Sequence, residues 1–463
     1  MLHDTNRTRG GLAASGTRAP AATAAAALAS ALLGGGTAAL AAGGPLSTSG
    51  NQIVDGTGTP VRIAGVNWFG FETGTHVPHG LWTRNWKELL QQVKDLGFNT
   101  LRIPWCNQAF EPGATTNSIN TWANPDLAGL SPIQVLDKIV DQCGVLGLRI
   151  ILDRHSAIAD NFANEDLWYI PGSGTWTEER WIADWVMLAN RYAGNHTVIG
   201  ADLFNEPKRT ATWGAGAPAT DWNEAAERGG NAILAANPEW LIFVEGVEKA
   251  NGQSTWWGGN LMAAATHPVT LDVPGRLVYS MHDYPASVYA QSWFGAPNYP
   301  ANLPGVWHGF WGYLFQENTA PLLLGEFGTK LQTVSDQQWL STLLAYAGGD
   351  FNLDGQSDLT GNQKGMSWTY WSLNPNSGDT GGILADNWIT VNQAKMTALA
   401  GSLAPLIGSS CQGDLDGSGA VDGADLGSLL AAWGQPGPAD LDGSGAVDGA
   451  DLGTLLAAWG ACP

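Results

Sequence analysis

Short apolar runs rich in β-branched residues alternate with amphipathic stretches of helical period between residues 43 and 408. Such runs are typical of strands that are buried on both faces of a parallel sheet. The expected strands cover 61–68, 100–105, 148–155, 198–207, 241–247, 276–284, 321–328 and 366–373. The expected helices cover 85–96, 132–146, 177–192, 221–236, 336–346 and 391–400. Helical stretches placed between parallel strands predict an α/β fold, a (β/α)8 TIM barrel.

A different pattern follows residue 410, where one segment occurs twice. Residues 414–434 recur 26 residues later as 440–460, with a single Ser-to-Thr change. Oxygen-bearing residues recur in both copies at the ligand spacing of an EF-hand calcium loop. The predicted ligands are Asp414, Asp416, Ser418, Ala420, Asp422 and Asp425 in the first copy and Asp440, Asp442, Ser444, Ala446, Asp448 and Asp451 in the second.

We therefore expect residues 411–463 to form a small all-α module with two EF-hand-type calcium loops. Trp433 and Trp459 are expected to pack its core. Cys411 and Cys462 bracket the repeat, and in an oxidising compartment they would form a disulfide.

The first 42 residues have the pattern of an export signal. Arg7, Arg9 and Arg18 precede an Ala-rich apolar stretch that ends in small residues around Ala41. This order of charged, apolar and small residues is typical of a signal peptide. The rest of the chain has no apolar run long enough to span a bilayer. The sequence therefore predicts a secreted protein without a membrane anchor.

Charge and aromatic content narrow the class of partner. The chain has 21 basic and 42 acidic residues, a formal charge of −21, and 23 tryptophans. A nucleic acid is excluded as a partner because its phosphates require a basic surface. The abundance of tryptophan favours stacking on flat neutral ligands such as sugars.

Polar residues stand at the carboxyl ends of the expected strands, where TIM barrels carry their active sites. They are Arg102, His155, Asn205, Glu206, His282, Tyr284, Glu326 and Trp371. The fourth and seventh strands lie on opposite sides of an eight-stranded barrel, so Glu206 and Glu326 should face each other across its mouth. Two facing carboxylates predict glycoside hydrolysis, and we expect the short separation that gives retention of configuration.

The same residues carry a resemblance to glycoside hydrolase family 5. The motifs are Asn205-Glu206-Pro207, Leu324-Gly-Glu326, Leu101-Arg102-Ile-Pro104 and His282-Asp283-Tyr284. Within that family, the chain is similar to secreted bacterial endoglucanases that cut β-1,4-glucan. The resemblance implies that Glu206 is the acid/base and that Glu326 is the nucleophile. No His/Cys/Asp cluster in the barrel sequence has the spacing of a zinc site, so no cofactor is expected for catalysis. The resemblance also implies substrate or carboxylate contacts from Arg102, His155, Asn205, His282, Tyr284 and Trp371, and stacking platforms at Trp82 and Trp257.

Two alternatives to cellulose hydrolysis stay open at this point. A β-mannanase or xylanase would use the same motifs, because these define the bond chemistry better than the sugar. A catalytically silent β-glucan-binding protein is the other, although the presence of both glutamates argues against it. A monomer is expected in each case.

The repeat resembles a dockerin, a module that binds cohesin domains on scaffold proteins. This resemblance implies a cohesin-type partner that contacts Gly423-Ala424 and Gly449-Ala450. A further calcium site is possible at Asp350–Asp358, where oxygen side chains follow the first part of a calcium loop. Cys106 and Cys143 are not expected to pair, since they fall near opposite ends of the barrel.

Overall fold

The computed structural model describes residues 44–408, 413–415, 420–437, 439–442 and 444–461. The predicted signal peptide (1–42), the Cys411–Cys462 disulfide, Asp416 and Ser418 lie outside these residues. In the part of the chain that is described, no helix is long and apolar enough to cross a membrane.

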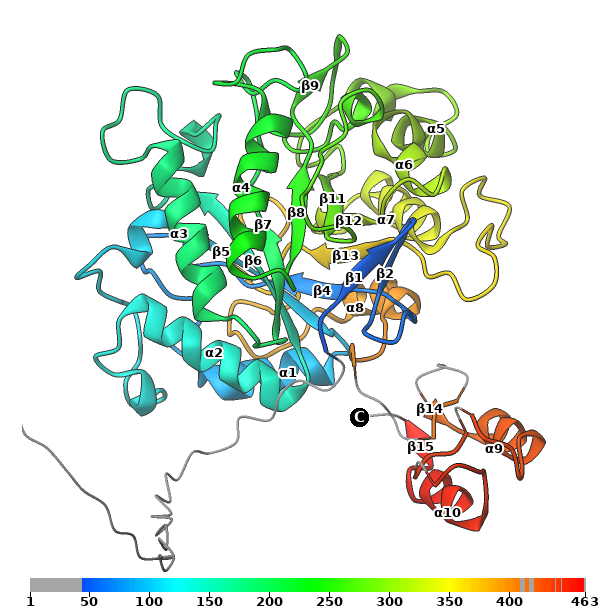
Figure 1. Cartoon of the computed structure of the whole chain (residues 1–463). Helices are drawn as coiled ribbons and strands as arrows, with labels where there is room; N and C mark the ends of the chain where they lie inside the picture. Colours follow the sequence, from blue (N-terminus) through cyan, green and yellow to red (C-terminus); the bar gives the residue numbers. More distant parts are fainter. Residues whose placement is uncertain (1–43, 409–412, 416–419, 438, 443, 462–463) are drawn as a thin grey trace, which may run out of the picture. The chain divides into compact units, whose positions relative to one another are not determined.

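Eight parallel strands close into a barrel, as Figure 1 shows. Consecutive strands are neighbours, and the last pairs with the first through Trp368 and Ala64. The strands are β4 (Ala64–Asn67), β5 (Thr100–Cys106), β6 (Arg149–Ser156), β7 (Val198–Asp202), β8 (Leu241–Glu245), β11 (Leu277–His282), β12 (Leu322–Glu326) and β13 (Ser367–Tyr370). The predicted (β/α)8 TIM barrel is thereby confirmed.

Helices cover the outside of the barrel (Figure 1). They are α1 (Trp86–Asp95), α2 (Pro132–Leu146), α3 (Glu178–Arg191), α4 (Trp222–Ala236), α5 (Leu303–Trp307), α6 (Tyr313–Gln316), α7 (Val334–Gly348) and α8 (Gln393–Leu399). No α-helix lies between β8 and β11, a segment that the structure describes in full. The chain forms the β9–β10 hairpin (Lys249–Ala250, Gln253–Ser254) and a 3₁₀ turn there.

Several element boundaries differ from the expectation by a few residues, and two of these differences have a clear local cause. The fourth predicted strand, 198–207, ends at Asp202, and residues 203–207 form a loop in which Glu206 has a φ of 54°. A residue in the left-handed region cannot continue a strand, so β7 is shorter than the apolar run predicted. The helix predicted at 336–346 starts at Val334, because the Thr333 side chain caps it by accepting the Asp336 N–H.

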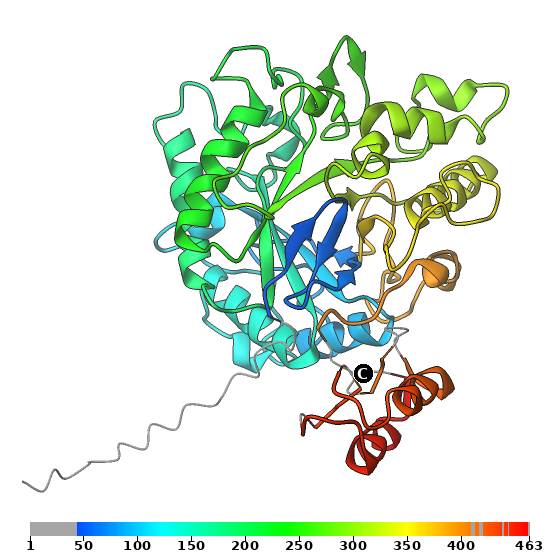
Figure 2. The same cartoon turned by 45° about the vertical axis from the view of Figure 1, so that its right-hand side comes forward.

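The amino-terminal ends of the strands are closed by a separate apolar plug. A small antiparallel sheet, β1 (Ser47–Ser49), β2 (Gln52–Val54) and β3 (Pro60–Val61), lies at this end (Figure 2). Leu46, Ile53 and Ile407 pack there against inward-facing residues of the barrel strands. This apolar closure leaves the opposite, carboxyl end of the barrel available for polar chemistry.

Cys106 and Cys143 are both buried and free, as expected. Burial raises the pKa of the Cys106 thiol to about 12, so this thiol stays protonated and unreactive at neutral pH.

The carboxy-terminal repeat has its own small core. Helices α9 (Gly423–Ala431) and α10 (Gly449–Ala457) each begin with a capping box, formed by Asp422 and Asp425 in the first and by Asp448 and Asp451 in the second. The core consists of Val421, Leu429, Ala439, Val447 and Leu455.

The all-α expectation for this module is wrong in one respect. Two short strands, β14 (Ala420–Val421) and β15 (Gly460–Ala461), pair in it. The predicted core role of Trp433 and Trp459 is also wrong, because these side chains are 46% and 50% exposed. The smaller valines and leucines already fill the interior of so short a repeat.

Gly200 provides a test of the barrel's packing. A Cβ atom on this β7 glycine would lie 2.2 Å from the backbone oxygen of Leu241 on β8. We expect Gly200→Ala to lower the free energy of unfolding by about 1–3 kcal/mol, because neighbouring strands would have to separate. Urea denaturation checks this. Gly348→Ala on α7 is the matched control, since its Cβ would meet no atom within 4 Å; it should raise stability by about 0.5–1 kcal/mol. Equal effects of the two substitutions would contradict the packing argument.

Candidate active site

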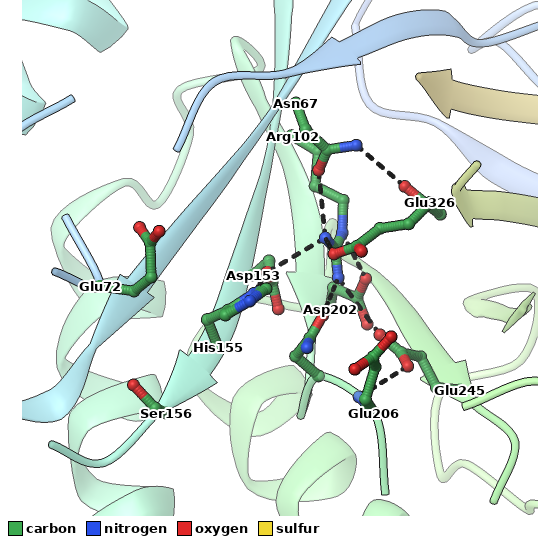
Figure 3. A network of polar contacts seen from close by, with 12 residues as sticks. Asn67, Glu72, Arg102, Asp153, His155, Ser156, Asp202, Glu206, Glu245 and Glu326 are labelled. Carbon is green, nitrogen blue, oxygen red and sulfur yellow. Dashed lines mark hydrogen bonds and ion pairs between the residues drawn. The ribbon is translucent and has the colours of Figure 1, made fainter. Parts of the chain in front are cut away.

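Charged and polar side chains from several barrel strands converge at the carboxyl end, and Figure 3 shows Arg102 among the carboxylates of Asp153, Asp202, Glu245 and Glu326. Arg102 is on β5, Asp153 and His155 are on β6, and Asn205 and Glu206 follow β7. Glu245, His282 and Glu326 end β8, β11 and β12. The predicted catalytic pair is therefore brought together by the closure of the sheet.

Arg102 lies at the centre of this cluster and has no exposed surface. Its guanidinium donates to Glu326 Oε1 at 2.7 Å, to Asp202 Oδ2 at 2.9 Å and to Asn205 Oδ1 at 3.1 Å. The resemblance implied that Arg102 contacts the substrate or a carboxylate, and the structure shows contacts with carboxylates. A fully buried side chain cannot itself reach a substrate in the cleft.

Glu326 is held by two donors. Arg102 donates to its Oε1, and the Tyr284 hydroxyl donates to its Oε2 at 2.8 Å. Burial raises the pKa of Glu326 above its usual value, while the positive charges of His282 and Arg102 oppose this rise. Hydrogen bonds to both oxygens keep the carboxylate in one orientation.

Glu206 is bound by His282. The His282 Nδ1 lies 3.0 Å from Glu206 Oε1. Burial acts to raise the pKa of Glu206, but the hydrogen bond and charge of His282 outweigh it, so the pKa lies below its usual value. Burial acts to lower the pKa of His282, yet the carboxylates of Glu245 and Glu326 raise it well above the ordinary range. The proton of this pair therefore resides on the imidazole.

The two glutamates come close to each other. One carboxylate oxygen of Glu206, one of Glu326 and a ring nitrogen of His282 all lie within 4.8 Å of one another. A second group of close ligand atoms comprises Asp153, His155 and Glu326. The Arg102 guanidinium bonds both carboxylates of that second group, so a cation already occupies the position that a metal would take.

A cleft of about 780 Å³ opens above the glutamates. It is lined by Phe69, His155, Asn205, Glu206, Trp256, Trp257, Tyr284, Tyr289, Glu326 and Trp371, among others. Trp371 stacks on Phe69 at 5.3 Å between ring centroids and on His155 at 5.7 Å, which gives one wall of the cleft a flat apolar face. Asp153 fixes the His155 ring by a 2.7 Å contact at Nδ1.

The two outer tryptophans differ in position. Trp257 lines the cleft, and the Lys208 Nζ lies 4.7 Å from the centre of its ring. Trp82 is not among the cleft-lining residues, but the His79 ring joins it to Phe69 at centroid distances of 5.2 and 5.1 Å. It is 39% exposed. Trp82 therefore continues the aromatic wall outward from the cleft.

Three carboxylates beneath the site were not predicted from the sequence. Asp153, Asp202 and Glu245 are all fully buried against Arg102. Each stands in or at the end of an apolar strand, which is the signal that identified Glu206 and Glu326. Only the folded barrel shows that they share a single guanidinium.

A family model described as Cellulase (glycosyl hydrolase family 5) matches residues 54–377. The chain belongs to this family. The resemblance carried by the motifs is confirmed, and the chain is an enzyme, a glycoside hydrolase of the cellulase family.

Known endoglucanases are similar over most of this cellulase-family chain. An endoglucanase of Paenibacillus polymyxa is 46% identical over 372 residues, which are 79% of this chain and 89% of the relative. The major extracellular endoglucanase of Xanthomonas campestris pv. campestris is 44% identical over 372 residues, 78% of this chain and 72% of the relative.

Solved structures show the same similarity. A complex of an endocellulase from Pyrococcus horikoshii with cellotetraose superposes with a TM-score of 0.70 at 39% identity, over 78% of this chain and 99% of that chain. The catalytic domain of the Xanthomonas enzyme gives a TM-score of 0.69 at 42% identity, over 76% and 98%.

His79 predicts how the stability of this cellulase-family chain depends on pH. Burial lowers its pKa from 6.5 to about 4, although Asp160 acts in the opposite direction. Between these pH values the unfolded chain binds a proton that the folded chain does not, so the free energy of unfolding should fall as pH decreases from 6.5 to 4. Urea denaturation across this range should show that the free energy of unfolding changes less steeply with pH in His79→Gln than in the wild type.

His308→Gln, at an exposed histidine, is the control and should leave this slope unchanged. Identical slopes in His79→Gln and wild type would contradict the assignment.

Proposed function

We propose that the chain is a secreted, retaining endo-β-1,4-glucanase that hydrolyses internal bonds of cellulose and related β-glucans. The observation that carries the proposal is the pair of glutamates in an aromatic-walled cleft, with one carboxylate oxygen of Glu206 within 4.8 Å of one of Glu326. A retaining mechanism uses closely spaced carboxylates, whereas an inverting one leaves room for a water between them. The names of the relatives, and the cellotetraose bound to one of them, support β-glucan as the substrate.

In the first step, a Glu326 carboxylate oxygen attacks the anomeric carbon and forms a glycosyl ester. The bond from that carbon to the leaving sugar's oxygen breaks, and Glu206 donates a proton to that oxygen. His282 supplies this proton, because its Nδ1 lies 3.0 Å from Glu206 Oε1. As the charge of Glu326 passes into the forming ester bond, it stabilises the protonated imidazole less, so within this step the proton passes from His282 to Glu206 and on to the leaving oxygen.

In the second step, Glu206 takes a proton from a water molecule. The resulting hydroxide attacks the anomeric carbon, the ester bond breaks, and Glu326 recovers its charge. Arg102 and Tyr284 are in place to stabilise the departing carboxylate through the bonds that they make in the free enzyme. His155 and Trp371 form the wall against which a sugar ring would stack.

Export and attachment complete the proposal. The signal-like segment 1–42 supports secretion, as does the extracellular location in the name of the Xanthomonas relative. The repeat module would attach the enzyme to a cohesin-type scaffold. Gly423, Ala424, Gly449 and Ala450, the positions implied for partner contact, are all exposed.

Calcium would be a structural ion of the module. In the second repeat, carboxylate oxygens of Asp440, Asp442 and Asp451 lie within 4.8 Å of one another. Asp440 also accepts the backbone N–H groups of Ser444 and Gly445, which curls the loop around these oxygens. Three converging carboxylates are the donor set that calcium prefers, so the described residues fit the ion.

The catalytic proposal predicts that Glu326→Gln abolishes hydrolysis of carboxymethylcellulose while the fold is kept, because an amide cannot attack the anomeric carbon. Viscosity and reducing ends measure the activity, with mannan and xylan in parallel. Glu248→Gln, which removes a carboxylate from the same cleft without touching the pair, should retain most of the activity. For the wild type, NMR should show the β-anomer as the first product.

Other outcomes would revise this proposal. An initial α-anomer would replace retention by inversion. Activity on mannan or xylan alone would change the substrate, and no activity on any of the three would favour a binding protein.

The calcium proposal predicts that the chelated full-length chain binds two calcium ions in isothermal titration calorimetry. Asp440→Ala should reduce the number to one, because it removes the first ligand of one loop. A third ion that is lost in Asp350→Asn would add the loop Asp350–Asp358 to the sites. Absence of calcium binding in the wild type would reject the assignment.

A further inference from the structure

Glu245 is a fully buried carboxylate that touches both sides of the catalytic apparatus. Its Oε2 accepts the backbone N–H of Glu206 at 2.8 Å. Its Oε1 lies 3.2 Å from an Arg102 nitrogen and 3.3 Å from His282 Nε2. One carboxylate thus links the acid/base residue, its histidine partner and the arginine that holds Glu326.

The backbone of Glu206 needs such support. Its φ of 54° is in the left-handed region, which is unfavourable for a residue with a side chain and persists only where neighbours impose it. Glu245 bonds the N–H of this residue, and the buried Lys208 donates to its carbonyl oxygen at 3.2 Å. Both polar groups of the strained peptide backbone are therefore bound by charged side chains.

The surroundings leave Glu245 a single position. Its own carbonyl oxygen accepts the Trp222 indole N–H at 2.8 Å. Gly258, with a φ of 71°, packs against the carboxylate so closely that a Cβ atom there would lie 2.2 Å from Glu245 Oε2. A glycine at this point gives the carboxylate the room to reach Glu206.

His282 faces three glutamates, since its Nδ1 also lies 3.7 Å from Glu326 Oε2. Its Nδ1 faces Glu206 Oε1 at 3.0 Å, and its Nε2 faces Glu245 Oε1 at 3.3 Å. The ring is fully buried. The Nε2 contact with Glu245 is an ion pair, whereas Nδ1 makes the hydrogen bond, so the protonated ring acts as the donor toward Glu206.

We propose that Glu245 is a positioning residue for the acid/base Glu206: it fixes the backbone of Glu206 and orients His282 so that Nδ1 donates to the Glu206 carboxylate. This inference rests on the proposed glucanase function. The role is not shared by every carboxylate that contacts Arg102. Asp202 accepts a hydrogen bond from the guanidinium but makes no hydrogen bond with Glu206 among the described residues.

The test uses leaving groups of different quality. An aryl β-cellobioside with an unsubstituted phenyl group needs a proton from Glu206, whereas the dinitrophenyl substrate leaves without one. In Glu245→Gln we expect kcat/KM to fall about a hundredfold on the phenyl substrate and by less than about threefold on the dinitrophenyl substrate. Cellotetraose should bind as tightly as to the wild type. A purely structural role would reduce kcat/KM on both substrates equally.

The pH dependence of kcat/KM provides a second measurement. Removing the Glu245 carboxylate removes a charge that favours protonated His282, so the pKa of His282 should fall. The alkaline limb of kcat/KM on the phenyl substrate should therefore move to lower pH. Glu245→Asp retains the charge on a shorter side chain. It should lower kcat/KM on the phenyl substrate without shifting the alkaline limb. This variant replaces Glu245→Gln in the test if Glu245→Gln does not fold.

Asp202→Asn is the matched control, because Asp202 is likewise fully buried and lies 2.9 Å from Arg102 Nε. It should keep the wild-type ratio of kcat/KM between the two substrates. Equal losses on both substrates in the Glu245 variants, or no loss, would overturn the inference. An inactive wild type would instead reject the proposed function.

Discussion

A buried guanidinium organises the active end of this barrel. Arg102 has no contact with solvent and lies within 3.2 Å of oxygens of Asp153, Asp202, Glu245 and Glu326. Removing an arginine from water is costly unless several partners compensate it, and removing one partner leaves the others uncompensated. The site is therefore a cooperative unit whose members come from strands far apart in the chain.

The charge cluster depends on the closed sheet. Arg102 on β5 contacts Asp153 on the adjacent β6 and Asp202 on β7, but it also reaches Glu326 on β12, three strands away in the other direction. Only a barrel directs all these side chains into a common interior. The apolar plug around Leu46 and Ile407 closes the other end, so the polar residues are confined to the mouth.

The site combines this rigid charged base with an aromatic wall. Phe69, Trp371 and His155 stack in sequence beside the glutamates, and Asp153 ties the His155 ring to the same arginine. The surface suited to a sugar ring and the carboxylates suited to its chemistry are therefore oriented by one set of contacts. Glu245 extends that arrangement to the backbone of Glu206.

The sequence by itself determined the order of strands and helices and the repeat, and it singled out Glu206 and Glu326 as the proposed catalytic pair, because these depend on local periodicity and on which residues end apolar runs. It could not show where strand β7 ends, since the backbone N–H at the Glu206 turn is bound by Glu245, a residue on another strand. It also placed Trp433 and Trp459 in the core of the module, where they are half-exposed. Only the tertiary structure decided that Asp153, Asp202 and Glu245 share Arg102, because the pairing of buried charges depends on distances that the closure of the barrel creates.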